Sequence, residues 1–135
     1  MRKLNWEQRL VDVIENHKNQ PFLLGELDCC QFARNCVVEI SQDDIPEIPH
    51  YHSLREALSV LVDLGGIEGV AEYLTHKQAK SACQAKRGDL LMIKSDDVTF
   101  DYKALAICEG NVAMAMGENG PVIVERDQWI KCWEV

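Results

Sequence analysis

The sequence predicts an α+β protein in which N-terminal helices pack on a C-terminal antiparallel β-sheet. Two observations lead to this prediction. Apolar residues recur at helical spacing up to about residue 74, and after Gly88 they gather into short runs separated by turn signals. Because helices precede strands, we expect the apolar face of the sheet to pack on the leading helices. The 135 residues, 47% of them hydrophobic, fit a single domain over residues 1–135.

The first two helices are predicted by their caps and by apolar spacing. The segment from Asn5 to about His17 opens with a possible N-cap. Gln8 follows where a capping box needs it, and Pro21 ends the helix before it. Asp28 is the expected N-cap of the second helix. That helix carries one apolar stripe, made of Cys29, Phe32, Ala33, Cys36, Val37 and Ile40.

Two more helices follow a proline-containing loop. Ser53 and Glu56 form a second capping-box signature ahead of apolar residues at helical spacing. The Gly65-Gly66 pair ends that helix, because glycine readily adopts the positive φ of a helix C-terminus. A short helix from Ile67 to about Leu74 comes next, and the polar residues from Thr75 to Arg87 predict a long connector.

Four strands are predicted after Gly88. They cover Asp89–Ile93, Ala104–Cys108, Val112–Met116 and Val122–Glu125, with a turn signal at residues 117–121. In the third strand Ala113 and Ala115 share one face, so we expect a helix to approach closely on the alanine side. The three tryptophans lie near the chain ends, where we expect them to fasten the termini to the core.

Charge narrows the classes of partner. The chain has 14 basic and 22 acidic residues and a formal net charge of −8. This charge opposes binding that depends on neutralising phosphates or anionic lipids, so we expect neither nucleic acid nor a membrane surface as a partner. No apolar run reaches the length of a membrane span, and the N-terminus carries no export signal.

The six cysteines are expected to stay reduced in a cytosol, because no export route is visible. They include no CxxC pair and no Cys/His spacing typical of zinc, so we expect no metal and no cofactor. His50 and His52 flank Tyr51 and would share a face in an extended segment. Three interpretations stand for them: two ligands of a metal site without an evident third, a substitute catalytic base, or a partly exposed loop pair.

Cys29 has the clearest chemical interest. A glycine-containing loop delivers it to the start of a helix, where unpaired N–H groups and partial positive charge stabilise a thiolate. This position favours a nucleophilic cysteine. The competing interpretation is an inert core thiol, because Cys29 also belongs to the apolar stripe and free cysteine is often buried. Cys30 lies beside the stripe and is interpreted as incidental.

Four motifs carry a family resemblance: Asp28-Cys29 at a helix start, Gly65-Gly66, Arg87-Gly88-Asp89-Leu90 and Trp133-Glu134-Val135. In order and spacing they resemble phage-encoded relatives of the NlpC/P60 papain-like peptidases. More narrowly, they are similar to the DUF6950 type of small proteins encoded among tail genes of phages and prophages. The resemblance implies an NlpC/P60-like papain fold, with Cys29 in the nucleophile position and a following sheet that presents a histidine.

The histidine that this resemblance implies is missing. In active NlpC/P60 enzymes the base stands at the start of the strand after the Gly-Asp strand, which corresponds here to residues 102–108. Lys103 or Ala104 occupies its place, and no histidine follows His76. General acid–base assistance typically raises the rate of such a reaction about 10²–10⁴-fold, so its loss argues against peptidase turnover.

Our leading hypothesis is therefore a degenerate, inactive peptidase-like domain with a structural or assembly role in a phage or prophage tail. It would be made in the bacterial host cytoplasm, bind tail proteins and reside in the virion tail. One alternative is an active cysteine peptidase or amidase that cuts peptidoglycan stem peptides, with Cys29 as nucleophile and His50 or His52 as base. Another is a small acidic protein that binds a host factor, which the charge of −8 favours.

Overall fold

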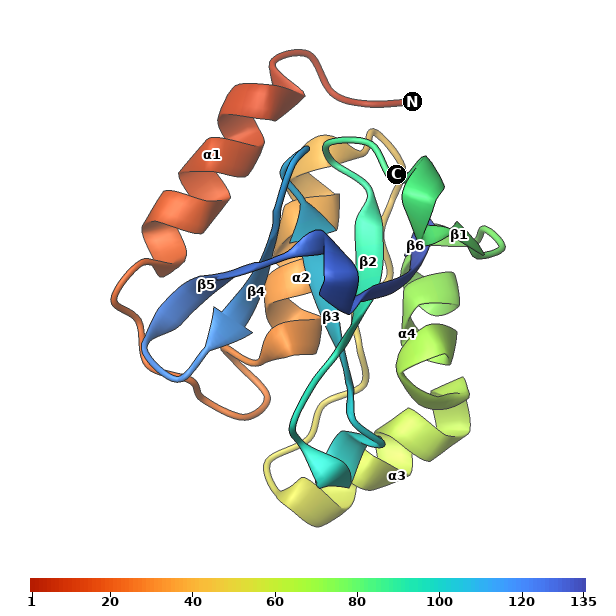
Figure 1. The fold of residues 1–135 in the computed structure, drawn as a ribbon. Coiled ribbons are helices and arrows are strands. Elements are labelled where there is room, and N and C mark those ends of the chain that lie inside the picture. Colours follow the sequence, from red (N-terminus) through yellow and green to blue (C-terminus); the bar gives the residue numbers. More distant parts are fainter.

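The computed structural model describes residues 1–135 and contains four helices and a six-stranded antiparallel sheet, so the predicted α+β class is confirmed (Figure 1). The helices are α1 (Trp6–His17), α2 (Cys29–Ile40), α3 (Leu54–Leu64) and α4 (Gly66–Thr75). The strands are β1 (Lys80–Ser81), β2 (Leu90–Lys94), β3 (Lys103–Cys108), β4 (Ala113–Gly117), β5 (Gly120–Val124) and β6 (Trp129–Trp133). Short 3-10 turns are η1 (Ala82–Gln84), η2 (Val98–Phe100) and η3 (Arg126–Gln128). None of the helices has the length and the apolar character that a membrane crossing requires.

The predicted caps form at α2 and α3 but not at α1. Asp28 accepts a hydrogen bond from the Gln31 N–H at 2.9 Å. Ser53 accepts one from the Glu56 N–H at 3.1 Å. The predicted capping box of α1 is wrong, because Asn5 adopts a left-handed conformation with a φ of 60° and makes no side-chain cap. An N-cap side chain normally reaches the helix from an extended backbone, which Asn5 lacks.

The sheet has the strand order β1-β6-β2-β3-β4-β5, so the last strand in sequence lies inside it. Neither β1 nor β6 is predicted from the sequence. β1 has only two residues in a polar segment, and Lys131 interrupts the apolar pattern of β6. The predicted role of the C-terminal tryptophans is confirmed, because Trp129 is 8% and Trp133 0% exposed.

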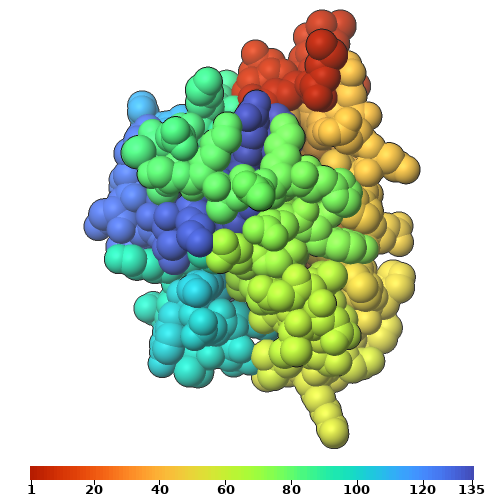
Figure 2. Space-filling model, turned by 90° about the vertical axis from the view of Figure 1, so that its right-hand side faces the viewer, coloured from red at the N-terminus to blue at the C-terminus, as the bar shows by residue number.

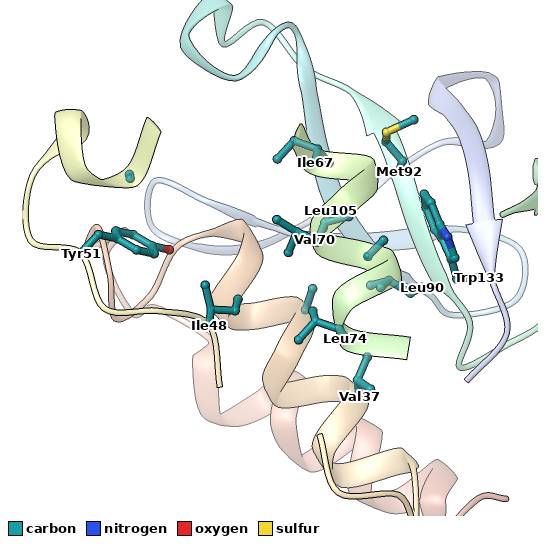
Figure 3. Close-up of a cluster of buried hydrophobic side chains, with 13 residues drawn as sticks. Val37, Ile48, Tyr51, Ile67, Val70, Leu74, Leu90, Met92, Leu105 and Trp133 are labelled. Atoms are coloured by element: carbon teal, nitrogen blue, oxygen red, sulfur yellow. The ribbon is translucent and has the colours of Figure 1, made fainter. Parts of the chain in front are cut away.

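Both faces of the sheet are buried, but helices cover only one. That face carries Leu90, Met92, Leu105 and Trp133, which pack against α2 and α4 (Figure 3). It also carries Ile107 and Met116, which pack against α1 and α2. The opposite face carries Ala113 and Ala115, which belong to a cluster with Trp129 that is flanked by Ala82 and Ala85. The predicted approach of a helix on the alanine side is therefore wrong: the small residues leave room for an aromatic side chain and a connector.

Arg2 ties the N-terminus to the start of β2 and to the last residue. Its guanidinium donates to Asp89 Oδ1 at 3.0 Å and to the Val135 carbonyl at 2.9 Å. It also lies 4.2 Å from the centre of the Trp6 ring. Gly88 has a φ of 94°, and a Cβ there would lie 2.7 Å from the guanidinium and 2.9 Å from the Trp6 ring. The Gly-Asp pair therefore has a structural role in joining the two chain ends.

Replacing Asp89 with asparagine should destabilise the fold. The Asp89 side chain is buried and accepts hydrogen bonds from Arg2 and from the Lys86 N–H. Hydrogen bonds to charged groups contribute about 1.5–3 kcal/mol each, so we expect Asp89→Asn to lose about 2–3 kcal/mol of unfolding free energy in urea denaturation. The control Glu134→Gln removes an exposed ion pair with Lys80 and should cost less than about 1 kcal/mol. Equal effects of the two variants would contradict the prediction.

Candidate functional site

Asp28 organises the start of α2. One carboxylate oxygen caps the helix through the Gln31 N–H, and the other accepts the Gly25 N–H at 2.9 Å and the Tyr51 hydroxyl. Gly25 has a φ of 84°, and a Cβ there would overlap the Tyr51 carbonyl oxygen, so only glycine fits this contact. One buried carboxylate therefore joins the entry loop, the helix start and the segment before α3.

Cys29 is the first residue of α2, and its sulfur faces the sheet. The backbone of Leu105 in β3 lies near the sulfur and lowers the pKa of Cys29. The Cys108 N–H donates to Asp89 on the β2 side, and N–H groups alternate along a strand, so the Leu105 N–H points away from β2. β4 pairs with β3 only at Ile107 and Cys108. The Leu105 N–H is therefore free of a sheet partner and available to the sulfur.

The thiol of Cys30 lies 3.9 Å from the Cys29 sulfur. Its hydrogen bond is the main cause that lowers the pKa of Cys29, and the Leu105 N–H lowers it further, while burial and the charge of Asp28 oppose both. The same hydrogen bond and burial raise the pKa of Cys30. Cys29 is therefore the more acidic thiol of the pair, and either thiol can donate the hydrogen bond while both are protonated.

Both cysteines line a cavity of about 140 Å³. Its apolar wall includes Leu24, Ile48, Val60, Leu61, Ile67 and Val70. Asp97 and Lys103 line it from the side of the sheet. Figure 2 looks onto the face where α3 and the segment around η2, which bound this cavity, lie side by side. The thiols thus adjoin a compartment that is mainly apolar.

The start of β3 holds no histidine. Lys103 and Ala104 line the cavity there, and the Lys103 ammonium lies 3.6 Å from the Asp101 carboxylate. No imidazole lines the cavity. The cavity beside Cys29 therefore offers no histidine to act as a general base.

His50 and His52 do not reach the cavity. Both are exposed, whereas Tyr51 between them is 6% exposed and its hydroxyl meets Asp28. Successive side chains of an extended segment point to opposite sides, so the buried tyrosine directs both imidazoles outward. Figure 3 shows the Tyr51 side chain lying toward the cluster that contains Ile48 and Val70. The structure brings neither histidine to Cys29.

The two remaining histidines also lie outside the cavity. His17 packs edge-on against Phe32, with ring centroids 5.2 Å apart, and His76 follows the last turn of α4. No group of three or more His, Cys, Asp or Glu side chains is arranged to hold a metal ion. The candidate site consists of the Cys29–Cys30 pair, the Asp28 cap and the apolar cavity.

Tyr51 and Cys30 are site residues that the sequence does not reveal. The alternation His50-Tyr51-His52 indicates that the tyrosine points inward when the histidines point outward. The histidines, however, are the residues whose chemistry makes them site candidates. Cys30 carries no such signal, because adjacent helical residues normally point in different directions. Here the two sulfurs nevertheless lie close together, in the first turn of α2.

The fold and the site define an α+β protein with a helix-start cysteine, an apolar cavity and a facing strand without histidine. The chain belongs to the family described as a domain of unknown function, DUF6950, which matches residues 1–135. The predicted DUF6950 type is thus confirmed. A comparison with curated proteins found no match.

Cys30→Ala should make Cys29 less acidic, because it removes the hydrogen bond that lowers the pKa of Cys29 most. We expect the pH midpoint for alkylation of Cys29 by iodoacetamide to rise, with the modified residue located by peptide mass spectrometry. Cys83→Ala is the control, since Cys83 is exposed and is not part of the pair. An unchanged midpoint in Cys30→Ala would show that the neighbouring thiol does not tune Cys29.

Tyr51→Phe should destabilise the protein by about 1–2 kcal/mol, because it removes a buried hydrogen bond to the Asp28 carboxylate. The matched control is Tyr73→Phe, which removes a hydrogen bond from an exposed hydroxyl to the Glu47 carbonyl. We expect the control to cost less than about 0.5 kcal/mol. Urea denaturation measures the loss of unfolding free energy in both variants. A larger loss in Tyr73→Phe would contradict the conclusion that the Tyr51–Asp28 hydrogen bond is the more important for stability.

Proposed function

We propose that the protein is a papain-fold component of a phage or prophage tail that has lost peptidase turnover and has a structural or assembly role. One observation carries the loss of turnover. Where the NlpC/P60 resemblance implies a histidine near Cys29, β3 offers Lys103, Ala104 and the backbone N–H of Leu105. The tail assignment, with tail proteins as partners, comes from the resemblance of the sequence motifs.

Amide hydrolysis needs a proton for the leaving amine, and no imidazole lines the cavity to supply it. Burial raises the pKa of Tyr51, whose hydroxyl already donates to Asp28. Lys103 lies beside Asp101. Without a general acid and base, a reactive thiol lacks the roughly 10²–10⁴-fold rate enhancement that such groups contribute to turnover.

The composition of the cavity also favours binding over cleavage of cell-wall peptides. Its wall is mainly apolar, and its charged side chains are Asp28, Asp97 and Lys103. Stem peptides carry free carboxylates, which a protein with a formal net charge of −8 repels. A partner that presents apolar groups fits this site better than an acidic peptide does.

The surface around the cavity supports protein contacts. Large apolar side chains are exposed on the segments that bound it, namely Phe22, Leu54, Val98 and Tyr102. Exposed apolar side chains that cluster are typical of interaction sites. Binding to other tail proteins at this end of the molecule is therefore the assembly role that we propose.

A peptidoglycan digest tests the loss of turnover. We expect purified full-length protein to release no new amino groups from stem peptides, as measured by mass spectrometry, and Cys29→Ala to behave identically. The lowered pKa of Cys29 favours the alternative of an active peptidase or amidase. Hydrolysis that disappears in Cys29→Ala would establish that alternative and refute the proposal.

A further inference from the structure

The Cys29–Cys30 pair adjoins a cavity that is built for an apolar group. We propose that this cavity accepts a short acyl chain, which a thioester donor transfers to the Cys29 sulfur. The proposal rests on the position of two thiols at the wall of an apolar compartment. It goes beyond the proposed function and does not depend on the tail assignment.

The size of the cavity limits the acyl chain. Its volume is about 140 Å³. An engineered cavity of about 150 Å³ lined by Leu, Ile and Phe stays dry and binds benzene. The present cavity, walled by residues such as Val60, Leu61 and Val70, therefore matches a chain of about six carbon atoms. A long-chain fatty acyl group exceeds this volume.

The groups around Cys29 suit thioester exchange better than amide hydrolysis. In the exchange, the bond between Cys29 Sγ and the acyl carbon forms while the bond between the acyl carbon and the donor sulfur breaks. The electron pair leaves with the donor sulfur, which takes up the proton that Cys29 released. A thiolate leaves without protonation, so the reaction proceeds without the general acid that an amine needs.

The same surroundings preserve the product. The Cys30 thiol retains its proton and is a poor competitor for the acyl group, since only a thiolate attacks efficiently. No imidazole lines the cavity to activate water against the new thioester. We therefore expect the acyl group to remain on Cys29 rather than to turn over.

The test uses neutral thioesters of N-acetylcysteamine, which avoid repulsion by the acidic protein. Full-length protein is incubated with acetyl, hexanoyl or hexadecanoyl thioester, and intact and peptide mass spectrometry measure the adduct. We expect one hexanoyl group on Cys29, formed about tenfold or more faster than the acetyl adduct because the longer chain buries more apolar surface. Hydroxylamine should remove it, hexadecanoyl should react poorly, and Cys29→Ala should not react.

Matched substitutions on α3 test the cavity itself. Val60→Phe fills it, because Val60 lines the cavity, whereas Val62→Phe places the same side chain at a position that is 77% exposed. We expect Val60→Phe to lose about tenfold or more in hexanoyl transfer, with alkylation of Cys29 by iodoacetamide retained, and Val62→Phe to match the wild type. Equal rates for all chain lengths, labelling mainly at Cys83, or an unaffected Val60→Phe would overturn the proposal. A thermal shift with hexanoyl thioester but no covalent adduct would overturn it as well, in favour of a pocket for an apolar side chain of a partner.

Discussion

The carboxylate of Asp28 joins three parts of the chain: the entry loop through Gly25, the first turn of α2 through Gln31, and the segment before α3 through Tyr51. A buried charge is costly unless it is hydrogen-bonded, and these donors satisfy it. Because Asp28 fixes the first turn of α2, it also fixes the direction of Cys29. Its negative charge raises the pKa of that cysteine, so the hydrogen bonds of neighbouring donors, and not local charge, make Cys29 acidic.

The divergence of β4 from β3 completes the site. Pairing stops at Ile107, and the next N–H on that side, at Leu105, is left to the Cys29 sulfur. The Leu105 backbone and the Cys30 thiol both lower the pKa of Cys29 and so stabilise its thiolate, and the Leu105 N–H accepts no proton from it. Stabilising the nucleophile and shuttling protons are separate tasks, and this site is equipped for the first.

The features that the sequence reveals are local ones. The α2 cap, the α3 capping box and the turn at Gly65, with a φ of 96°, follow from short-range chemistry that leaves a clear pattern. The order of helices and strands follows from hydrophobic periodicity for the same reason. β6 is not predicted, because its partners β1 and β2 are distant in sequence and Lys131 interrupts its run of apolar residues. Within the site, the helix-start position of Cys29 is readable, whereas the inward turn of Tyr51 depends on a tertiary hydrogen bond to Asp28.

The two chain ends meet at a distance from the cavity and therefore do not cover it. Arg2 holds the N-terminus against Asp89 and Val135, and both termini lie at one end of the molecule, opposite α3 and η2 (Figure 1). The cavity lies toward the end that α3 and η2 form, away from this junction. The Arg2–Asp89 contacts close the fold at one end, while the thiol pair and its apolar wall stand at the other. A partner or an acyl group at the cavity would contact α3 and η2 without displacing the contacts that hold the chain ends together.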